Sequence, residues 1–163
     1  MRIIMWLVGG IALLALLAVA AGQFGFLQGT APADLGVRNG RLKPPSATEN
    51  SVTSQAALYP DHPQRFYSAV APLPVKGDGP ATMARIKAQV EAMAGAKVVK
   101  SAPDYLYAQF TTQWMKFVDD VEFWFDPANN VIQVRSASRL GSRDMGVNRK
   151  RVEAVRAALA GAQ

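Results

Sequence analysis

Alternating apolar and polar residues between Val121 and Ala137 constrain the fold of this chain more than any other feature. The run is interrupted once, at 127–130, where Pro-Ala-Asn-Asn is typical of a turn. With these four residues as the loop, Glu122 lies opposite Arg135 as a cross-strand ion pair, and each apolar residue meets an apolar one. A slip of one residue would mix the two faces, so the sequence predicts an antiparallel hairpin in this register.

Patterns on either side predict the α+β class, with a small antiparallel sheet and two packing helices. One helix is expected to start within Gly77-Asp78-Gly79-Pro80, because proline suits a first turn and apolar residues then recur at helical spacing until Gly95. A second helix is expected over about Asn148–Leu159, with Asn148 as its N-cap. Further strands are predicted at Phe66–Leu73, Ala96–Ser101, Asp104–Thr111 and Trp114–Val118.

The N-terminal segment carries no charged side chain from Ile3 to Ala33 and is apolar throughout from Ile3 to Ala21. As a helix, these 19 residues would reach about 28 Å, close to the hydrocarbon thickness of a bilayer. We predict an uncleaved, single-pass anchor that contacts membrane lipid. A cleaved secretory signal is the alternative, because Ala18-Val19-Ala20 follows a basic start and cleavage at Ala20 would give a secreted domain. A buried core helix is disfavoured by the lack of a polar face.

Two sequence features give opposite answers about topology. The loop-charge rule alone favours a cytoplasmic domain, because only Arg2 precedes the span while Arg38, Arg41 and Lys43 lie beyond it. The very short N-terminal tail and its signal-like character favour a domain outside the cytoplasm, in the periplasm. We take the second arrangement as the prediction.

The chain is expected to divide into an anchor or signal segment at 1–27, a flexible tether at 28–53 and an α+β domain at 54–163. The tether is rich in Gly, Pro, Ala and Thr, a composition that buries too little apolar surface to order itself. The net charge of +6 suits anionic lipid, cell-wall polymer or nucleic acid. The lack of cysteine excludes disulfides, thiol nucleophiles and thiolate metal sites.

An anion-binding constellation is the candidate site. Hydroxyl, amide and guanidinium groups that converge at a helix start suit a phosphate or a carboxylate. The alternative for the run 149–151 is neutralisation within the fold by Asp144, Glu153 and the pair Asp119-Asp120. The predicted anion-binding residues are Arg135, Ser136, Ser138, Arg139, Asn148, Arg149 and Arg151.

Catalysis is the competing interpretation, as a small hydrolase or lyase that uses Asp119, Asp120 or Glu122. Adjacent strand residues point to opposite faces, so Asp119 and Asp120 would not address one ion without a bulge, and pairing with nearby arginines is the default. The single histidine, His62, has no partner nucleophile motif. No catalytic residue, metal ligand or cofactor is therefore assigned, and nucleic acid is not an expected partner of a membrane-tethered domain.

Several segments of the chain resemble one bacterial and plant family. They read VDDVEFWFD, VRSASRLGSRDMGVNRKRVEAVR, PDYLYAQF, LGVRNGRL and NSVTSQA. Together they resemble the domain of unknown function 1499 over about Leu35–Leu159. The resemblance implies a small α+β domain, often preceded by membrane segments, and it brings no established activity. It also implies a difference, because family members carry cysteines that would form a disulfide where this chain has Pro45 and Ser51.

The apolar N-terminus, the tether and the many arginines together predict a membrane-anchored, extracytoplasmic binding or accessory module without enzymatic activity. Its basic face would bind an anionic partner, such as a lipid headgroup, a polymer or another envelope protein.

Overall fold

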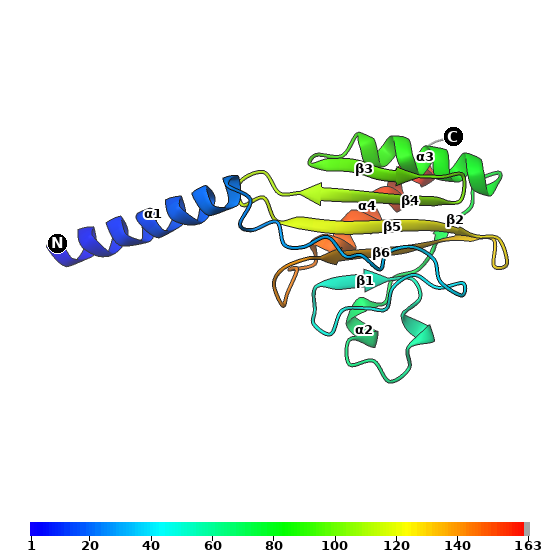
Figure 1. Cartoon of the computed structure of the whole chain (residues 1–163), viewed down its shortest axis with the longest axis horizontal. Coiled ribbons are helices and arrows are strands. Elements are labelled where there is room, and N and C mark those ends of the chain that lie inside the picture. Colours follow the sequence, from blue (N-terminus) through cyan, green and yellow to red (C-terminus); the bar gives the residue numbers. More distant parts are fainter. Residues whose placement is uncertain (162–163) are drawn as a thin grey trace.

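The computed structural model describes residues 1–161 and shows one long helix standing out from an α+β domain (Figure 1). The elements are α1 (Arg2–Gln23), β1 (Ser51–Thr53), η1 (Ala56–Leu58), α2 (Arg65–Ser68), β2 (Leu73–Pro74), α3 (Gly79–Glu91), β3 (Ala96–Ser101), β4 (Tyr105–Thr111), β5 (Val118–Asp126), β6 (Val131–Ser138) and α4 (Val147–Gly161). The sheet is antiparallel in the order β1-β6-β5-β4-β3, and β2 pairs with another part of β6. The predicted fold class is confirmed.

The central hairpin β5–β6 has the predicted register. Asp126 lies opposite Val131 across the four-residue loop, and Glu122 lies opposite Arg135. The loop closes with Asn130 in the left-handed region, at φ 51°, a conformation that asparagine tolerates better than most residues. The alternation of apolar and polar residues in both strands was therefore sufficient to predict which residues pair across the hairpin.

The predicted ion pair between Glu122 and Arg135 is wrong, although the residues face each other. Glu122 Oε1 accepts hydrogen bonds from Tyr105 and from the backbone N–H of Gly36, whereas Arg135 Nε donates to the carbonyl of Pro44. Their charged groups do not come within ion-pair distance. Glu122 and Arg135 therefore bond to the neighbouring strand β4 and to backbone groups of residues 36 and 44, and not to each other.

Helices α3 and α4 cover one face of the sheet and form the core with it. The predicted start of α3 is confirmed: the Asp78 side chain caps it by accepting from Ala81 N at 2.7 Å, and Pro80 lies in its first turn. The core residues are Val52, Leu73, Met83, Ile86, Val90, Leu106, Ala108, Phe110, Val121, Phe123, Ile132, Val134, Val152, Val155 and Leu159.

Two predicted strands are wrong. Within Phe66–Leu73, the chain forms the short helix α2, Ala69 makes only an isolated bridge to Thr53, and Leu73 alone belongs to a strand of the sheet, while Phe66 stays exposed. Within Trp114–Val118, the chain turns between β4 and β5, with Lys116 at φ 56° reversing its direction. A β-strand cannot continue through Lys116, because its backbone is in the left-handed region.

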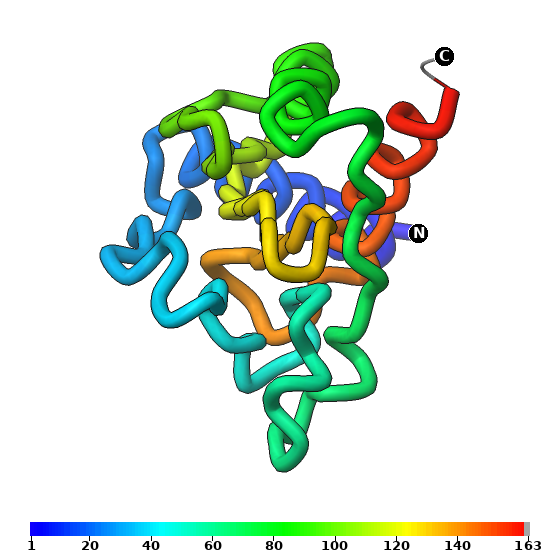
Figure 2. The backbone as a smooth tube through the Cα atoms, turned by 90° about the vertical axis from the view of Figure 1, so that its right-hand side faces the viewer, coloured from blue at the N-terminus to red at the C-terminus, as the bar shows by residue number. Residues whose placement is uncertain are grey.

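The other face of the sheet is covered by residues 28–50, which lie opposite α4 (Figure 2). Leu42 is buried, and its N–H donates to Gln55 Oε1 at 2.8 Å. The division into anchor, tether and domain stays a prediction. Within the range assigned to the tether, however, β1 pairs with β6 and the segment before it contacts the sheet.

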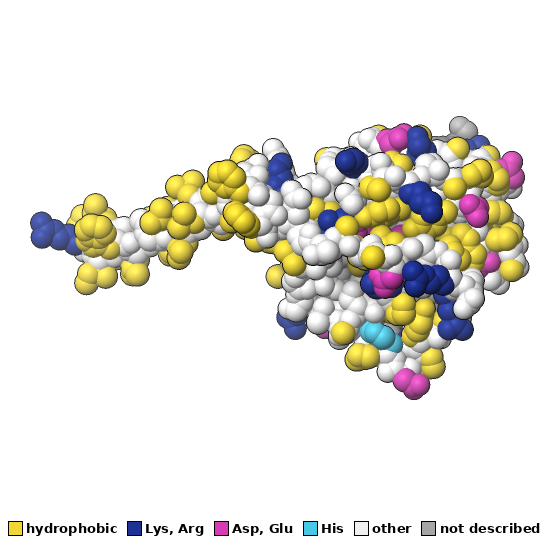
Figure 3. All heavy atoms as spheres, viewed as in Figure 1, with side chains coloured by type: hydrophobic (Ala, Val, Ile, Leu, Met, Phe, Trp, Pro, Cys, Tyr) yellow, Lys and Arg dark blue, Asp and Glu magenta, His cyan; other side chains and the backbone are white. Residues whose placement is uncertain are grey.

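Helix α1 is the one helix in residues 1–161 that is long and apolar enough to cross a membrane, a test that a signal sequence also passes. Its residues are exposed as far as Leu17, and hydrophobic side chains follow its visible face (Figure 3). Gly22 is its only buried residue and packs against Met115, while Gln23 Nε2 donates to the carbonyl of Trp114 at 2.9 Å.

Candidate functional site

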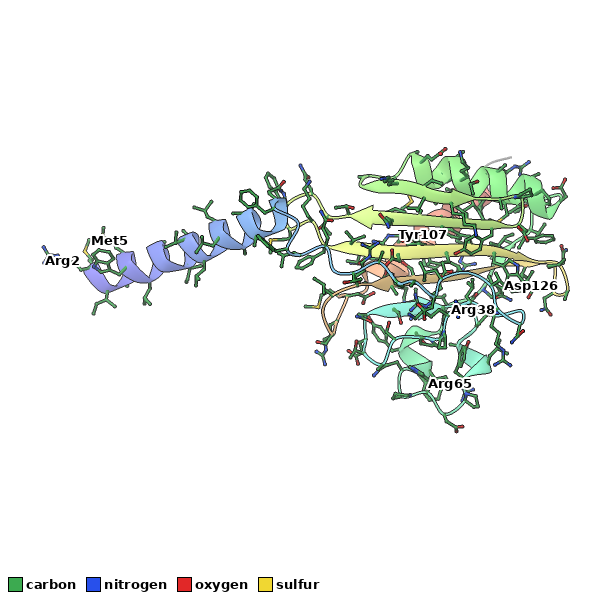
Figure 4. All side chains as sticks on the ribbon, in the orientation of Figure 1. Arg2, Met5, Arg38, Arg65, Tyr107 and Asp126 are labelled. Carbon is green, nitrogen blue, oxygen red and sulfur yellow. The ribbon has the colours of Figure 1, made fainter. Side chains whose placement is uncertain are left out.

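The sheet face under residues 28–50 is lined by polar side chains from three strands. The register places Tyr107 of β4 opposite Glu122 of β5, and Glu122 opposite Arg135 of β6. Figure 4 labels Tyr107 on the sheet and Arg38 on the covering segment. This face therefore holds carboxylates, phenols and guanidinium groups beneath a layer of backbone.

Asp120 and Arg139 form a closed, buried ion pair on this face. Arg139 donates through Nε and one terminal nitrogen to the two Asp120 oxygens, at 2.8 and 2.7 Å, and Tyr107 donates to the same carboxylate at 2.6 Å. The hydrogen bond to Asp120 raises the pKa of Arg139. Because its oxygens are occupied by these donors, Asp120 is not placed to act as a free base.

Glu122 is fully buried and only half satisfied. Oε1 accepts from Tyr105 at 2.7 Å and from Gly36 N at 2.6 Å, but Oε2 has no hydrogen-bond partner in the part of the chain that the structure describes. Burial raises the pKa of Glu122, and it outweighs the opposing hydrogen bond from Tyr105. Burial, together with the Glu122 carboxylate, also raises the pKa of Tyr105.

Arg135 is the cation on this face that lacks a carboxylate partner. The residue is 4 % exposed, and the one hydrogen bond of its side chain within residues 1–161 runs from Nε to Pro44 O at 3.1 Å. Burial lowers the pKa of Arg135, although the charges of Glu122 and Asp120 oppose that effect. The two terminal nitrogens, which can donate four hydrogen bonds, have no protein acceptor among the described residues.

Arg135 borders a cavity of about 410 Å³ between β6 and the covering segment. The other charged side chains that line it are two ion pairs, Lys43–Asp34 at 2.6 Å and Arg139–Asp120 at 2.7 Å. Both pairs are neutral overall, so Arg135 is the charged side chain of the described cavity lining that has no ion-pair partner. A guanidinium in this position can bind a planar or tetrahedral anion through paired hydrogen bonds.

Four residues of the predicted constellation lie together on the opposite face, between the sheet and α4. Ser136 donates to Asn148 Oδ1 at 2.5 Å, and Arg151 donates to Asn148 at 2.7 Å and to Asp119 at 2.6 Å. Asn148 in turn donates to Ser138 at 3.1 Å. These groups satisfy one another in a buried network that fastens α4 to the sheet, with the Arg151 guanidinium 4.4 Å from the centre of the Phe110 ring.

The structure thus divides the seven predicted residues into three places. Arg135 and Arg139 lie on the face covered by residues 28–50, the network of Ser136, Ser138, Asn148 and Arg151 lies on the helix face, and Arg149 lies at neither. Arg149 donates to the backbone carbonyls of Tyr67 and Ala69 beside α2. Anion binding by these residues stays a prediction, but they do not form a single constellation.

The prediction that Asn148 caps α4 is wrong. The helix begins at Val147, and the side chain of Asp144 accepts from Gly146 N at 2.9 Å and from Asn148 N at 3.1 Å. Asn148 lies one residue inside the helix because its side chain is buried in the network with Ser136. Aspartate and asparagine are equally favoured as helix N-caps, so residue type alone does not show whether Asp144 or Asn148 caps α4.

The three carboxylates of the catalytic interpretation do not all lie on one face of the sheet. Asp119 points to the helix face and binds Arg151, whereas Asp120 and Glu122 lie on the other face. No cluster of three His, Asp or Glu side chains suited to a metal occurs within residues 1–161. His62 lies in the turn before α2, where its Nδ1 accepts from Gln64 N at 3.1 Å.

Sequence reasoning missed the covering segment as part of the site. Lys43, Asp34 and the carbonyl of Pro44 all surround Arg135, but they lie in the range expected to be a tether. No periodic pattern marks this segment, since it binds through backbone groups and isolated side chains. Two signals mark this segment, the three basic residues at 38–43 and the family-like stretch LGVRNGRL, but neither indicates that it packs against Arg135.

The region from the covering segment to α4 corresponds to a known family. The family model described as "Protein of unknown function (DUF1499)" matches residues 41–159, which include Lys43, Arg135 and Arg139 but not α1. No curated protein and no solved structure matches this chain. The match extends over most of the domain and agrees with the resemblance in its segments, and the chain therefore belongs to the DUF1499 family of proteins of unknown function.

Proposed function

We propose that this protein is a membrane-anchored binding module whose cavity at Arg135 holds the anionic group of a ligand. The observation that supports it is Arg135, a residue that is 4 % exposed, borders a cavity of about 410 Å³ and has two terminal nitrogens without an acceptor in residues 1–161. An arginine held in this way is a poor stabiliser of the fold, because its burial costs free energy that no carboxylate contact offsets.

A carboxylate or phosphate group would complete the cavity. Either group accepts two parallel hydrogen bonds from the terminal nitrogens of one arginine. The ammonium of Lys43 lies on the same cavity wall and adds attraction at a distance, although Asp34 neutralises much of it. The ligand class we propose is therefore a small molecule or a chain end with one exposed carboxylate or phosphate.

Helix α1 would hold the module on a membrane, with the domain outside the cytoplasm, in the periplasm. Its length and its lack of a polar face support a span. Cleavage after Ala20 would instead release the domain. The intact mass of the protein purified from the membrane fraction separates these outcomes, since cleavage would remove α1 up to that point.

The experiment that tests the cavity is a calorimetric titration of the full chain, in nanodiscs of neutral lipid, with inorganic phosphate and with acetate. Arg135→Met is expected to weaken binding roughly tenfold or more, because charge-assisted hydrogen bonds are lost. Arg143→Met is the matched control: it makes the same charge change at an exposed residue outside the cavity. Equal binding by both variants would contradict the proposal.

Arg135→Met also removes a buried side chain, so a second variant keeps the test valid if it folds poorly. Lys43→Met leaves the sheet untouched and changes a residue on the cavity wall that is about a third exposed. We expect it to weaken binding by a smaller factor than Arg135→Met. If both Lys43→Met and Arg135→Met bind phosphate and acetate as the wild type does, the anion binds elsewhere.

A further inference from the structure

Large apolar side chains are exposed at the end of the domain from which α1 emerges. Met145 is 82 % exposed and Trp114 is 65 % exposed, values normal for polar side chains rather than for these two. They belong to a surface that we call the proximal patch. The proximal patch consists of Trp114, Phe117, Leu140, Met145 and Val147.

The residues of the proximal patch are neighbours in space. Phe117, Leu140, Met145 and Val147 line one cavity of about 280 Å³, which brings the β4–β5 loop and the β6–α4 loop together. Trp114 lies in the first of these loops. Both loops lie at the end of the sheet nearest α1 (Figure 1). The patch is therefore one surface.

The last turn of α1 contacts this same surface. Gly22 packs on Met115, and Gln23 donates to the carbonyl of Trp114. The chain then continues through Phe24 and Phe26, which are 80 % and 78 % exposed. If α1 spans a bilayer, the hydrocarbon boundary lies close to Trp114, and the proximal patch faces the bilayer.

Elsewhere on the described part of the domain, large exposed apolar side chains are scattered. Leu58 lies in η1, Phe66 in α2 and Val99 in β3, each in a different element. Single exposed apolar residues are ordinary on a soluble protein, whereas a contiguous group indicates an interaction surface. The group of exposed apolar side chains beside α1 therefore indicates a surface that binds a partner.

Basic groups border the proximal patch. Lys116 and Lys150 line a cavity of about 820 Å³ together with Val147, and Arg143 is well exposed nearby. Apolar side chains with Trp among them, next to lysines, are the composition of protein surfaces that lie in the interface of a membrane with anionic lipid. The charge and the position both point to lipid rather than to a second protein.

We propose that the proximal patch inserts into the headgroup region of the bilayer that α1 crosses, so that the domain lies against the membrane instead of moving freely above it. This inference rests on the proposed membrane anchoring by α1 and adds a second membrane contact. In that arrangement, Trp114 and Met145 contact the upper acyl region, while Lys116 and Lys150 reach lipid phosphates.

The chain has no cysteine, so single-cysteine fluorescent labels test the proposal cleanly. We would attach an environment-sensitive label to Met145→Cys, Phe66→Cys and Leu13→Cys in the full chain, reconstituted in nanodiscs with anionic lipid. Phe66 is the matched control, because it is 86 % exposed but lies in α2 and does not line the cavity of the patch. Leu13 reports on α1 itself.

We expect the labels at 13 and 145 to show blue-shifted emission and several-fold stronger quenching by lipid-borne quenchers than the label at 66. Trp114→Cys provides a second reporter of the patch and should behave like Met145→Cys. If the label at 13 is in lipid while those at 145 and 114 match the label at 66, the second contact is refuted and the anchor is not. If the label at 13 is also in water, the anchor itself is refuted.

Discussion

Asp119 and Asp120 are adjacent in β5, yet each binds an arginine on a different face of the sheet. Asp119 accepts from Arg151 of α4 at 2.6 Å, and Asp120 accepts from Arg139 beyond β6 at 2.7 Å. All four side chains are less than a tenth exposed. Asp119 and Asp120 therefore connect β5 to α4 on one face and to the chain beyond β6 on the other. They do not form a paired-carboxylate centre.

Removal of one partner from the helix-face pair should destabilise the domain strongly. Asp119→Leu leaves Arg151 buried without its carboxylate and is expected to cost about 3–5 kcal/mol of unfolding free energy. The double variant Asp119→Leu with Arg151→Met should recover much of that loss, since it removes both charges. Urea unfolding followed by tryptophan fluorescence measures both values.

The exposed pair Lys87–Glu91 in α3 is the control for this measurement. Its side chains are 40 % and 48 % exposed, so Lys87→Met should change the unfolding free energy by no more than about 0.5 kcal/mol. A cost for Asp119→Leu as small as that of Lys87→Met would mean that Arg151 reaches solvent once its partner is gone, and that the pair does not fasten α4.

The half-satisfied Glu122 should make stability depend on pH in a definite direction. Burial raises its pKa above the ordinary value of 4.5, so the folded state retains the proton over a pH range in which the unfolded state has lost it. Its contribution is complete below pH 4.5 and is lost as pH rises through the folded pKa. Glu122→Gln cannot ionise, so the stability of the wild type relative to this variant should fall as pH rises.

Denaturant unfolding of wild type and Glu122→Gln at a series of pH values from 4 to 8 checks this sign. The glutamine can still accept from Tyr105 and Gly36, so the variant is expected to be at least as stable as wild type at neutral pH. Glu122→Ala, which loses both hydrogen bonds, is the control for the loss of contacts. A stability difference that does not change with pH would show that Glu122 titrates normally.

The hairpin and the covering segment show why the sequence predicted one part of the molecule and not the other. The register of β5 and β6 follows from side chains alone, because both strands alternate and both bury the same face. The contacts of Gly36 N with Glu122, and of Pro44 O with Arg135, are made by backbone groups. Any residue type supplies such groups, so the sequence carried no pattern from which to predict them.

The separation of the predicted anion-binding residues has a similar cause. Ser136 and Arg135 are neighbours in β6, and the alternation of a strand sends them to opposite faces. The same alternation separates Asp119 from Asp120 in β5. It places Arg135 with Glu122 and Ser136 with α4, so this separation follows from the strand pattern alone.

The cap of α4 gives a prediction about Asp144. Its carboxylate accepts from the N–H groups of Gly146 and Asn148 and from the hydroxyl of Tyr67. Asp144→Ala should therefore cost about 0.5–2 kcal/mol of unfolding free energy, as for other helix caps. Tyr67→Phe keeps the cap but removes the phenol, so the difference between the two variants isolates the backbone contribution.

The same carboxylate also sets a pH dependence of opposite sign to that of Glu122. Although burial opposes ionisation, the hydrogen bonds from Tyr67, Gly146 and Asn148 hold the pKa of Asp144 below its ordinary value of 3.8. Its contribution is complete above that value and is lost as pH falls through the folded pKa. The stability gap between wild type and Asp144→Ala should therefore narrow in acid, and a gap that widened there would contradict this assignment.

Gly22 should control how α1 sits on the domain. A Cβ at this position would overlap the carbonyl of Met115, so Gly22→Leu is expected to push the helix off the β4–β5 loop. Gly10→Leu is the matched control, because nothing lies within 4 Å of that position. The distance between spin labels at Leu17→Cys and Thr112→Cys should broaden in Gly22→Leu and stay narrow in Gly10→Leu, while the unfolding free energy of the domain changes little in either. A narrow distribution in both variants would mean that the hydrogen bond from Gln23 to Trp114 is sufficient to position the helix.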